Sequence, residues 1–283
     1  MNPTKNRKMN AKEVIKDILR PFKRFATRFQ TEYTIDCLKT RHSYKSRFAA
    51  LKDIHKGKRC FIIGNGPSLT AEDLTLLKDE YTFAANRVFY IYSKTLWRPT
   101  YYCCQDEVVF KDIANKIPSF LSESEYGFFS SYLMRFCKDD LAKNDKAMFF
   151  YSKFSENHSK VRFSECIDSY VYDGGTITYA AMQLAAYMGF SEIYLIGVDN
   201  NYSASSFKGN NISGADVKAS YFEGMPTDIK MTKPRPEASV LSFLVAKEYA
   251  DSHDIFIGNA TRGGKLEVFP RVVLEDVLKK KNL

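Results

Sequence analysis

Short apolar runs alternate with amphipathic segments along most of this chain. The apolar runs have the length of buried strands, and they are Cys60–Ile63, Tyr81–Ala85, Thr100–Cys104, Ala147–Tyr151, Glu192–Val198 and Asp254–Gly258. The segments in which apolar residues recur at helical spacing are Ala71–Leu77, Val108–Ile117, Ile177–Met188, Ala238–Ser252 and Leu274–Lys280. Apolar strands that alternate with helices are typical of a parallel sheet covered on both faces. The pattern predicts an α/β fold with a doubly wound, mostly parallel, Rossmann-like sheet.

The N-terminal part of the chain has a different pattern, which predicts a basic helical arm over residues 1–57. Between residues 11 and 30, apolar and basic side chains share one helical periodicity, although Pro21 should kink this helix. Such a helix suits the surface of an anionic membrane, and it suits equally well packing on the main domain or on a second subunit. Residues 58–283 are predicted to form the α/β domain. Within it, the polar, aperiodic segment 203–236 is predicted to be a lid or binding loop.

Charge separates the same two parts. The net charge of the 283 residues is +9, but residues 1–59 alone hold 17 Lys and Arg against 5 Asp and Glu. The rest of the chain is therefore slightly acidic, which argues against a nucleic-acid partner for the main domain. The six cysteines form no Cys-x-x-Cys pair, and neither a signal peptide nor a membrane-spanning run is visible. We expect a cytoplasmic protein that can lie peripherally on the inner face of the membrane, and homo-oligomerisation stays open.

A glycine turn follows the first predicted strand. It comprises Gly64, Asn65, Gly66, Pro67 and Ser68, and it leads into a helix with Thr70 and Asp73 spaced as in a capping box. Glycine turns at helix N-termini commonly bind phosphate, although neither Gly-x-Gly-x-x-Gly nor Walker A is present. We expect a nucleotide at this turn, and the alternative is an ordinary tight connection.

Other polar residues follow other predicted strands, where ligands of parallel sheets collect. Candidate nucleotide-binding residues are Asn86, Arg87, Gln105 and Asp106, because amides suit a base or ribose and arginine suits phosphate. Candidate substrate-binding residues are Gly174, Gly175, Thr176 and Arg262. Asp199 ends a central strand and is the candidate catalytic carboxylate. No metal cluster is expected.

Four motifs resemble the bacterial 6-hydroxymethylpterin diphosphokinase-like (MptE-like) family over roughly residues 58–272. They are Phe61–Leu69, Gly174–Tyr179, Tyr194–Asp199 and Asn259–Glu267. A more distant resemblance is to bacterial sialyltransferases that use CMP-sialic acid, and it implies that the first glycine turn and Asn86 hold the nucleotide and that Tyr202 assists departure of the phosphate. In those enzymes the general base is a His before the last strand. No His lies in 203–236 here, so a carboxylate would replace it, and the candidates are Asp199, Asp216, Glu223 and Asp228.

These observations favour a nucleotide-sugar-dependent glycosyltransferase that acts on a bacterial surface glycan or glycolipid, in polysaccharide biosynthesis, and that needs no cofactor. One alternative is a diphosphokinase that uses Mg²⁺ held by Asp106 and Asp199. Another is a nucleotide-binding module without catalysis.

Overall fold

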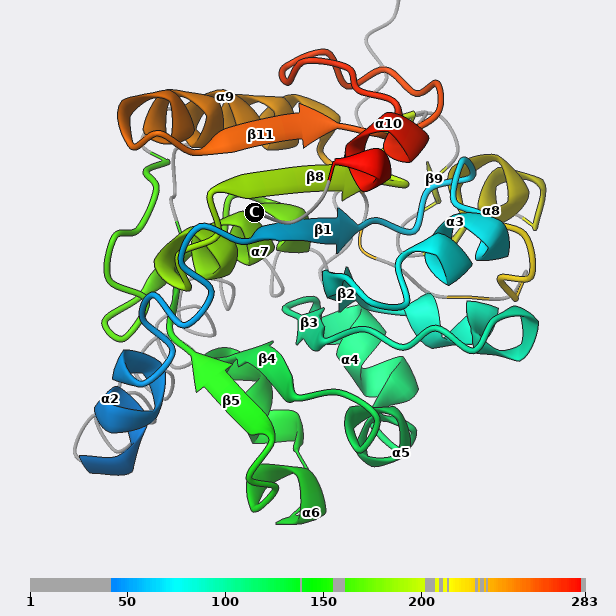
Figure 1. The fold of residues 1–283 in the computed structure, drawn as a ribbon. Coiled ribbons are helices and arrows are strands. Elements are labelled where there is room, and N and C mark those ends of the chain that lie inside the picture. Colours follow the sequence, from blue (N-terminus) through cyan, green and yellow to red (C-terminus); the bar gives the residue numbers. More distant parts are fainter. Residues whose placement is uncertain are drawn as a thin grey trace, which may run out of the picture.

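The protein is described here from a computed structural model, which covers residues 42–137, 139–154, 161–201, 207–208, 211–212, 214–226, 229, 232 and 234–280. In this part of the chain, seven strands form one sheet in the order β11-β8-β1-β2-β3-β4-β5 (Figure 1). They are β1 (Arg59–Ile63), β2 (Tyr81–Ala85), β3 (Tyr101–Cys104), β4 (Tyr126–Ser130), β5 (Ala147–Phe150), β8 (Glu192–Ile196) and β11 (Phe256–Asn259). Every pairing in this sheet is parallel. The predicted doubly wound α/β class is confirmed.

The strand order reverses direction at β1. Phe61 in β1 lies opposite Thr82 of β2 on one side and opposite Tyr194 of β8 on the other. From β1 the chain first builds the sheet outward to β5, and it later returns to add β8 and β11 beyond the other edge of β1. A crevice opens at the carboxyl ends of the strands at such a reversal, and ligands of open parallel sheets bind there.

Helices cover both faces of the sheet (Figure 1). They are α2 (His42–Ala49), α3 (Ala71–Leu76), α4 (Glu107–Ile113), α5 (Ile117–Leu121), α6 (Asp139–Ala142), α7 (Ile177–Tyr187), α8 (Gly214–Ser220), α9 (Pro236–Ser252) and α10 (Leu274–Lys279), with short 3₁₀ helices η1 (Val88–Lys94) and η2 (Ser131–Phe136). Alternate β1 side chains enter separate cores: Ile62 packs in the core that contains α7 and α9, and Phe61 packs in the core that contains α3 and α4. β1 is therefore buried on both faces, which explains its unbroken apolar sequence.

Several elements differ from the predicted pattern. The strand β4 was missed, because Gly127 interrupts its short apolar run and glycine is unfavourable within strands. The predicted helix Val108–Ile117 ends early as α4, and α5 then begins at Ile117 with Pro118 in its first turn. Proline fits a first turn because its missing N–H group would have no helical partner there. Two small pairs of strands, β6 (Ser152–Lys153) with β7 (Val171–Tyr172) and β9 (Phe207–Lys208) with β10 (Asn211–Ile212), were also not predicted.

The predicted N-terminal arm is described only from residue 42. Phe48 and Leu51 are buried in the same core as α7, and the N–H group of Asp53 donates to the carbonyl of Tyr187. Residues 42–57 thus pack on the α/β domain, whereas the amphipathic segment 11–30 lies outside the described residues. Among the helices described, none combines the length and the apolarity that crossing a bilayer requires.

Candidate functional site

The glycine turn after β1 packs tightly against the segment that follows β8. The N–H groups of Gly64 and Gly66 donate to the carbonyls of Ile196 and Gly197, each across 2.8 Å. A β-carbon on Gly64 would overlap the carbonyl oxygen of Gly197, and one on Gly66 would overlap the carboxylate of Asp199. The N–H groups of Gly64 and Gly66 therefore hold the neighbouring backbone, and a nucleotide at this turn would bind through other groups.

Asp199 lies beneath this turn, where Ser68 contacts it. The hydroxyl of Ser68 donates to Oδ2 of Asp199 across 2.8 Å, and only 5% of the Asp199 surface is exposed. Burial raises the pKa of this carboxyl above its ordinary value, and the hydrogen bonds from Ser68 act in the opposite direction. A carboxylate with a raised pKa can accept a proton more readily than an exposed aspartate.

A cavity of about 120 Å³, here called the first cavity, opens at the carboxyl ends of β1, β2 and β8. Its lining comes from the glycine turn, the residues after β2 and β8, the start of α7, the end of α8 and α9, and it comprises Ile63–Pro67, Ala85, Asn86, Thr176–Thr178, Gly197–Asn201, Ser220, Tyr221, Ser239 and Phe243. This is the crevice at which the strand order reverses. Six segments of the chain therefore meet around one cavity, and three of them follow β1, β2 and β8, as the strand-end pattern predicts.

Three asparagine side chains of the first cavity have buried carbonyl oxygens without a hydrogen-bond partner among the described residues. They belong to Asn65, Asn86 and Asn201. The Asn65 amide is oriented by its Nδ2, which donates to the carbonyl of Ala85 across 3.0 Å, so its Oδ1 is the atom left over. Asn86 has a left-handed backbone (φ 57°), and its carbonyl accepts from Tyr102 across 2.7 Å. Buried acceptors without partners are rare in folded proteins, and each of these three can accept a hydrogen bond from a ligand or a water.

The second glycine turn joins the first cavity to α9. Thr176 caps α7 by accepting from the N–H group of Thr178, and Ser242 of α9 donates to the carbonyl of Gly174 across 2.7 Å. Gly174 has a left-handed backbone (φ 58°), and a β-carbon there would overlap the ring of Tyr179. Thr176 lines the first cavity, and Gly175 lines a neighbouring one described below.

Five of the predicted site residues line this neighbouring cavity of about 600 Å³, here called the second cavity. Gln105 and Asp106 line it, and Asn86 and Thr176 line both cavities. Asp106 also caps α4, since its Oδ1 accepts from the N–H group of Val109 across 2.9 Å. The described structure thus brings Gln105 and Asp106 beside the first cavity but not into it.

Two arginines predicted to bind anions lie elsewhere. Arg87 is 2% exposed, and its guanidinium group donates twice to Asp112, at 3.1 and 2.7 Å. Arg262 contacts Asp73 and Glu275, and the hydrogen bond with Asp73 is the main cause of its raised pKa. Each guanidinium group is thus held by carboxylates of this chain, and neither residue lines the two cavities. The structure does not support an anion-binding role for them.

Several lining residues were not selected from the sequence. Asn201 lies two positions after the Tyr194–Asp199 motif, and its position after a central strand was a usable signal. No comparable signal marked Ser239 and Phe243 of α9 or Tyr221 after α8. Their positions beside the first cavity depend on how the helices pack on the sheet. In the predicted loop 203–236, the described residues 220 and 221 form part of the cavity wall, and the N–H group of Phe222 donates to the carbonyl of Asn65 across 3.1 Å.

The remaining candidate bases have different surroundings. Glu223 is exposed and pairs with Lys94 across 3.4 Å. The side chain of Asp216 and the residues Tyr202 and Asp228 lie outside what the structure describes. Asp199 is therefore the one described candidate base that lines the first cavity.

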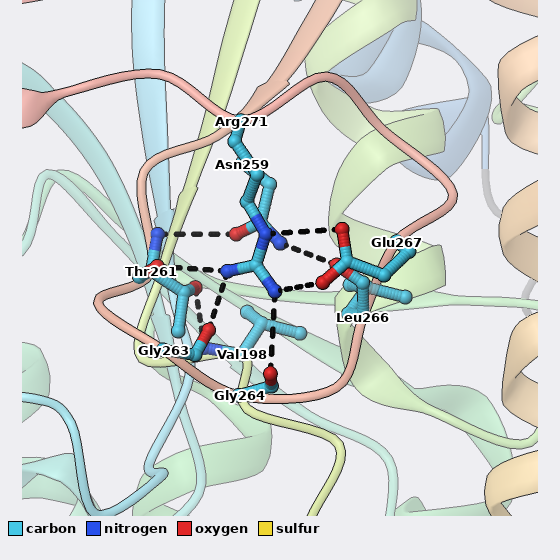
Figure 2. A network of polar contacts seen from close by, with 8 residues as sticks. All are labelled: Val198, Asn259, Thr261, Gly263, Gly264, Leu266, Glu267 and Arg271. Atoms are coloured by element: carbon cyan, nitrogen blue, oxygen red, sulfur yellow. Dashed lines mark hydrogen bonds and ion pairs between the residues drawn. The ribbon is translucent and has the colours of Figure 1, made fainter.

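A network of hydrogen bonds centred on Arg271 contacts the segment after β8 that contains Val198 and Asp199 (Figure 2). The Arg271 guanidinium group donates to the carbonyls of Thr261 and Gly264, at 3.0 and 3.3 Å, and also to that of Gly263. The loop held in this way returns two contacts to the segment after β8: the Thr261 hydroxyl accepts from the N–H group of Val198 across 3.1 Å, and the N–H group of Lys265 donates to the carbonyl of Asp199 across 2.7 Å.

The sequence of this chain matches one known protein family. The family model for 6-hydroxymethylpterin diphosphokinase MptE-like proteins matches residues 35–205. The chain belongs to this family. This confirms the resemblance drawn from the motifs, whereas no curated protein sequence matches the chain.

The fold also resembles solved transferase structures. The Maf glycosyltransferase from Magnetospirillum magneticum AMB-1 aligns with a TM-score of 0.50 at 14% identity over 87% of this chain, which spans only 41% of that protein. The sialyltransferase CstII from Campylobacter jejuni, solved in complex with cytidine-5'-monophosphate, aligns with a TM-score of 0.47 at 16% identity, over 77% of this chain and 85% of that one. At 14% identity the first likeness shows a shared fold.

Proposed function

We propose that this member of the MptE-like family is a glycosyltransferase that uses a nucleotide-activated sugar. The observation that carries the proposal is the first cavity, where a buried carboxylate lies beside three amide oxygens that lack hydrogen-bond donors among the described residues. A nucleotide supplies such donors through its ribose hydroxyls and its base. The fold shared with the Maf glycosyltransferase supports this reading only as an analogy, because one fold can host many functions.

Asp199 is the residue we assign as general base. In the transfer step, the oxygen of an acceptor hydroxyl bonds to the anomeric carbon of the donor sugar while its proton moves to the Asp199 carboxylate. The bond between the anomeric carbon and the phosphate oxygen breaks, and its electron pair leaves with the nucleotide phosphate. The raised pKa of Asp199 brings its basicity closer to that required at neutral pH. Tyr202 keeps its proposed role at the leaving phosphate, and this role rests on the family resemblance alone.

The family description also makes a diphosphokinase a candidate, with Mg²⁺ on the triphosphate. Two carboxylates were expected to share that metal, Asp106 and Asp199. They line different cavities. Asp199 already accepts a hydrogen bond from the Ser68 hydroxyl, and Asp106 accepts one from the N–H group of Val109 in α4. The residues therefore do not fit a shared metal site, and we assign no step to one. The acceptor class proposed from the sequence, a bacterial surface glycan or glycolipid reached from the inner membrane face, remains part of the proposal.

Calorimetry with CMP, UDP and ATP, each with and without Mg²⁺, tests the assignment, followed by turnover measurements with the corresponding nucleotide sugars. We expect binding of a nucleoside mono- or diphosphate without metal. Asp199→Asn should lower turnover by roughly 10²–10⁴-fold, the range typical of an acid–base group, while nucleotide affinity changes little. Asp79→Asn, at an exposed carboxylate paired with Lys78, is the matched control. Binding of ATP only with Mg²⁺, with transfer of diphosphate, would establish the kinase instead.

A further inference from the structure

The second cavity adjoins the first and lies within the size range of small-molecule sites. Its volume is about 600 Å³, compared with the roughly 300–1,000 Å³ typical of ligand pockets. Asn86 and Thr176 line both cavities, so a group bound in one would lie next to a group bound in the other. The first cavity, at about 120 Å³, lies below that range and takes only part of the nucleotide proposed above, and no group has been assigned to the second.

Gln105 shows what kind of group the second cavity accepts. Its side chain is 7% exposed, and its Nε2 donates to the carbonyl of Asp173 across 3.3 Å. The Tyr132 hydroxyl donates to the Gln105 carbonyl and so holds the backbone as well. With the amide nitrogen oriented in this way, the buried Oε1 has no partner among the described residues. A ligand in this cavity that carries a hydroxyl or N–H group can therefore donate a hydrogen bond to Gln105.

An aromatic surface faces the same space. Phe154 lines the second cavity and is 55% exposed, although phenylalanine is usually buried. Its ring packs edge-on against Tyr132, with 5.6 Å between the ring centroids. The face of an aromatic ring carries partial negative charge and attracts weakly positive C–H groups. The apolar C–H face of a sugar ring has the shape and polarity that this surface complements.

The charged groups of the described lining disfavour an anion. Asp106 and Asp173 each use one carboxylate oxygen to accept a backbone N–H group, at 2.9 Å in both cases. Glu107 is paired with Lys111 and Arg135. The cationic side chain in this part of the lining is Arg235, which is exposed at the start of α9. The cavity wall thus presents acceptors and an aromatic face, and it is acidic rather than basic.

We infer that the second cavity binds an uncharged sugar ring, which donates hydroxyl hydrogen bonds to Gln105 and places its C–H face on Phe154. This inference rests on the proposed function only for its role, in which this sugar is the acceptor whose hydroxyl points toward the first cavity. The sugar site itself is independent of whether a nucleotide occupies the first cavity.

Saturation-transfer NMR with the full chain tests the site. The probes are methyl glycosides of glucose, galactose and N-acetylglucosamine, with N-acetylneuraminic acid as the anionic comparison. We expect saturation of at least one neutral glycoside, strongest at its C–H face. Phe154→Ala should weaken that binding by about 2- to 10-fold, since an aromatic contact contributes of order 0.5–1.5 kcal/mol. Phe256→Ala removes another exposed phenylalanine that lines neither cavity, and it should leave binding unchanged.

Gln105→Met gives a second readout at nearly constant size, and circular dichroism checks that each variant is folded. Loss of glycoside binding in Gln105→Met, with the fold intact, supports the inference. It is overturned if no neutral glycoside is saturated, if Phe154→Ala and Phe256→Ala behave alike, or if the anionic sugar binds best and is lost in Arg235→Ala. Nucleotide calorimetry on the same samples separates the two proposals: glycoside binding without nucleotide binding refutes the transferase alone, and the reverse refutes the sugar site alone.

Discussion

Ser68 donates a hydrogen bond of 2.8 Å to Asp199, a residue that lies 131 positions later in the chain. This contact joins the glycine turn after β1 to the segment after β8, across the point at which the strand order reverses. It also stabilises the ionised form of a carboxyl that burial would otherwise keep protonated. The same contact therefore holds two loops together and sets the proton affinity of the proposed base.

Replacing Ser68 by alanine should move the acid limb of the pH–rate profile to higher pH. A general base must be ionised, so activity falls as pH decreases through the pKa of Asp199. Removing a donor to the ionised form raises that pKa further above its ordinary value, and the limb follows it upward. The measurement is kcat/KM against pH for the wild type and Ser68→Ala. Ser122→Ala is the control, because the Ser122 hydroxyl donates to a backbone carbonyl on the exposed surface. An unmoved acid limb would show that Asp199 is not the base.

Replacing Gly66 by alanine should destabilise the fold through a steric conflict with Asp199. The new β-carbon would overlap the carboxylate and would lie 2.7 Å from the carbonyl oxygen of Gly197. Overpacking of this kind typically costs about 1–3 kcal/mol of unfolding free energy. Urea unfolding measures the loss, and a double-mutant cycle with Asp199→Ala assigns it. Removing the carboxylate should recover part of the stability of Gly66→Ala, whereas strictly additive losses would contradict this explanation.

Replacing Arg271 by alanine should lower both stability and turnover. The guanidinium group holds the loop whose Thr261 and Lys265 contact the Asp199 segment, so its loss should loosen the position of the base. Arg271→Lys should recover only part of the function, because an ammonium group cannot reproduce the planar fork.

Arg98→Ala is the matched control for this variant. Arg98 donates to two backbone carbonyls and to the carboxylate of Glu123, and it lines neither cavity. Arg271 donates to three backbone carbonyls and to the carboxylate of Glu267, so the two side chains make similar sets of contacts. Both alanine variants should lose about 1–3 kcal/mol of stability. Only Arg271→Ala should reduce kcat at a temperature at which both proteins are folded. Equal kcat values for the two variants would limit Arg271 to a purely structural role.

The sequence predicted the elements of the fold and the edge of the sheet that carries the site. Apolar strands and polar residues at their ends are local patterns, and they located Asn65, Asn86 and Asp199. Because parallel strands bring their carboxyl ends together, this local information was enough to predict that these residues would meet. The missed strand β4 shows the limit of the same approach. A glycine within this short strand interrupts the apolar run by which a buried strand is recognised.

The roles of individual side chains followed less closely from the sequence. Arg87 and Arg262 carry the charge that a phosphate requires, but carboxylates of other elements, Asp112 and Asp73, hold them instead. Arg87 and Asp112 lie 25 positions apart in the chain, and Arg262 and Asp73 lie 189 positions apart. Such pairs depend on the packed fold and leave no local pattern in the sequence. At Gly66 the close neighbour that would exclude a side chain is Asp199, a contact across the fold that leaves no local pattern in the sequence.

The last prediction concerns the segment before residue 42, for which the sequence alone provides the argument. Residues 1–59 carry 12 more basic than acidic residues, and the apolar positions of 11–30 share one helical periodicity. If the acceptor is a glycolipid, a basic amphipathic helix would concentrate the protein on the anionic surface where that acceptor lies. We expect the full chain to float with vesicles that contain anionic lipid, and less of it to do so as salt rises, because salt screens attraction between charges.

Deletion of residues 1–30 provides the comparison. The shortened chain keeps Phe48 and Leu51, which pack in the core, so its fold and its nucleotide affinity should be retained while vesicle binding is lost. Packing of the segment on a second subunit predicts a different result, namely oligomers that persist at high salt and separate only when residues 1–30 are removed. Sedimentation of both forms at low and high salt distinguishes the two. If neither form floats at low salt, the segment does not bind membranes, and the acceptor must reach the second cavity from solution.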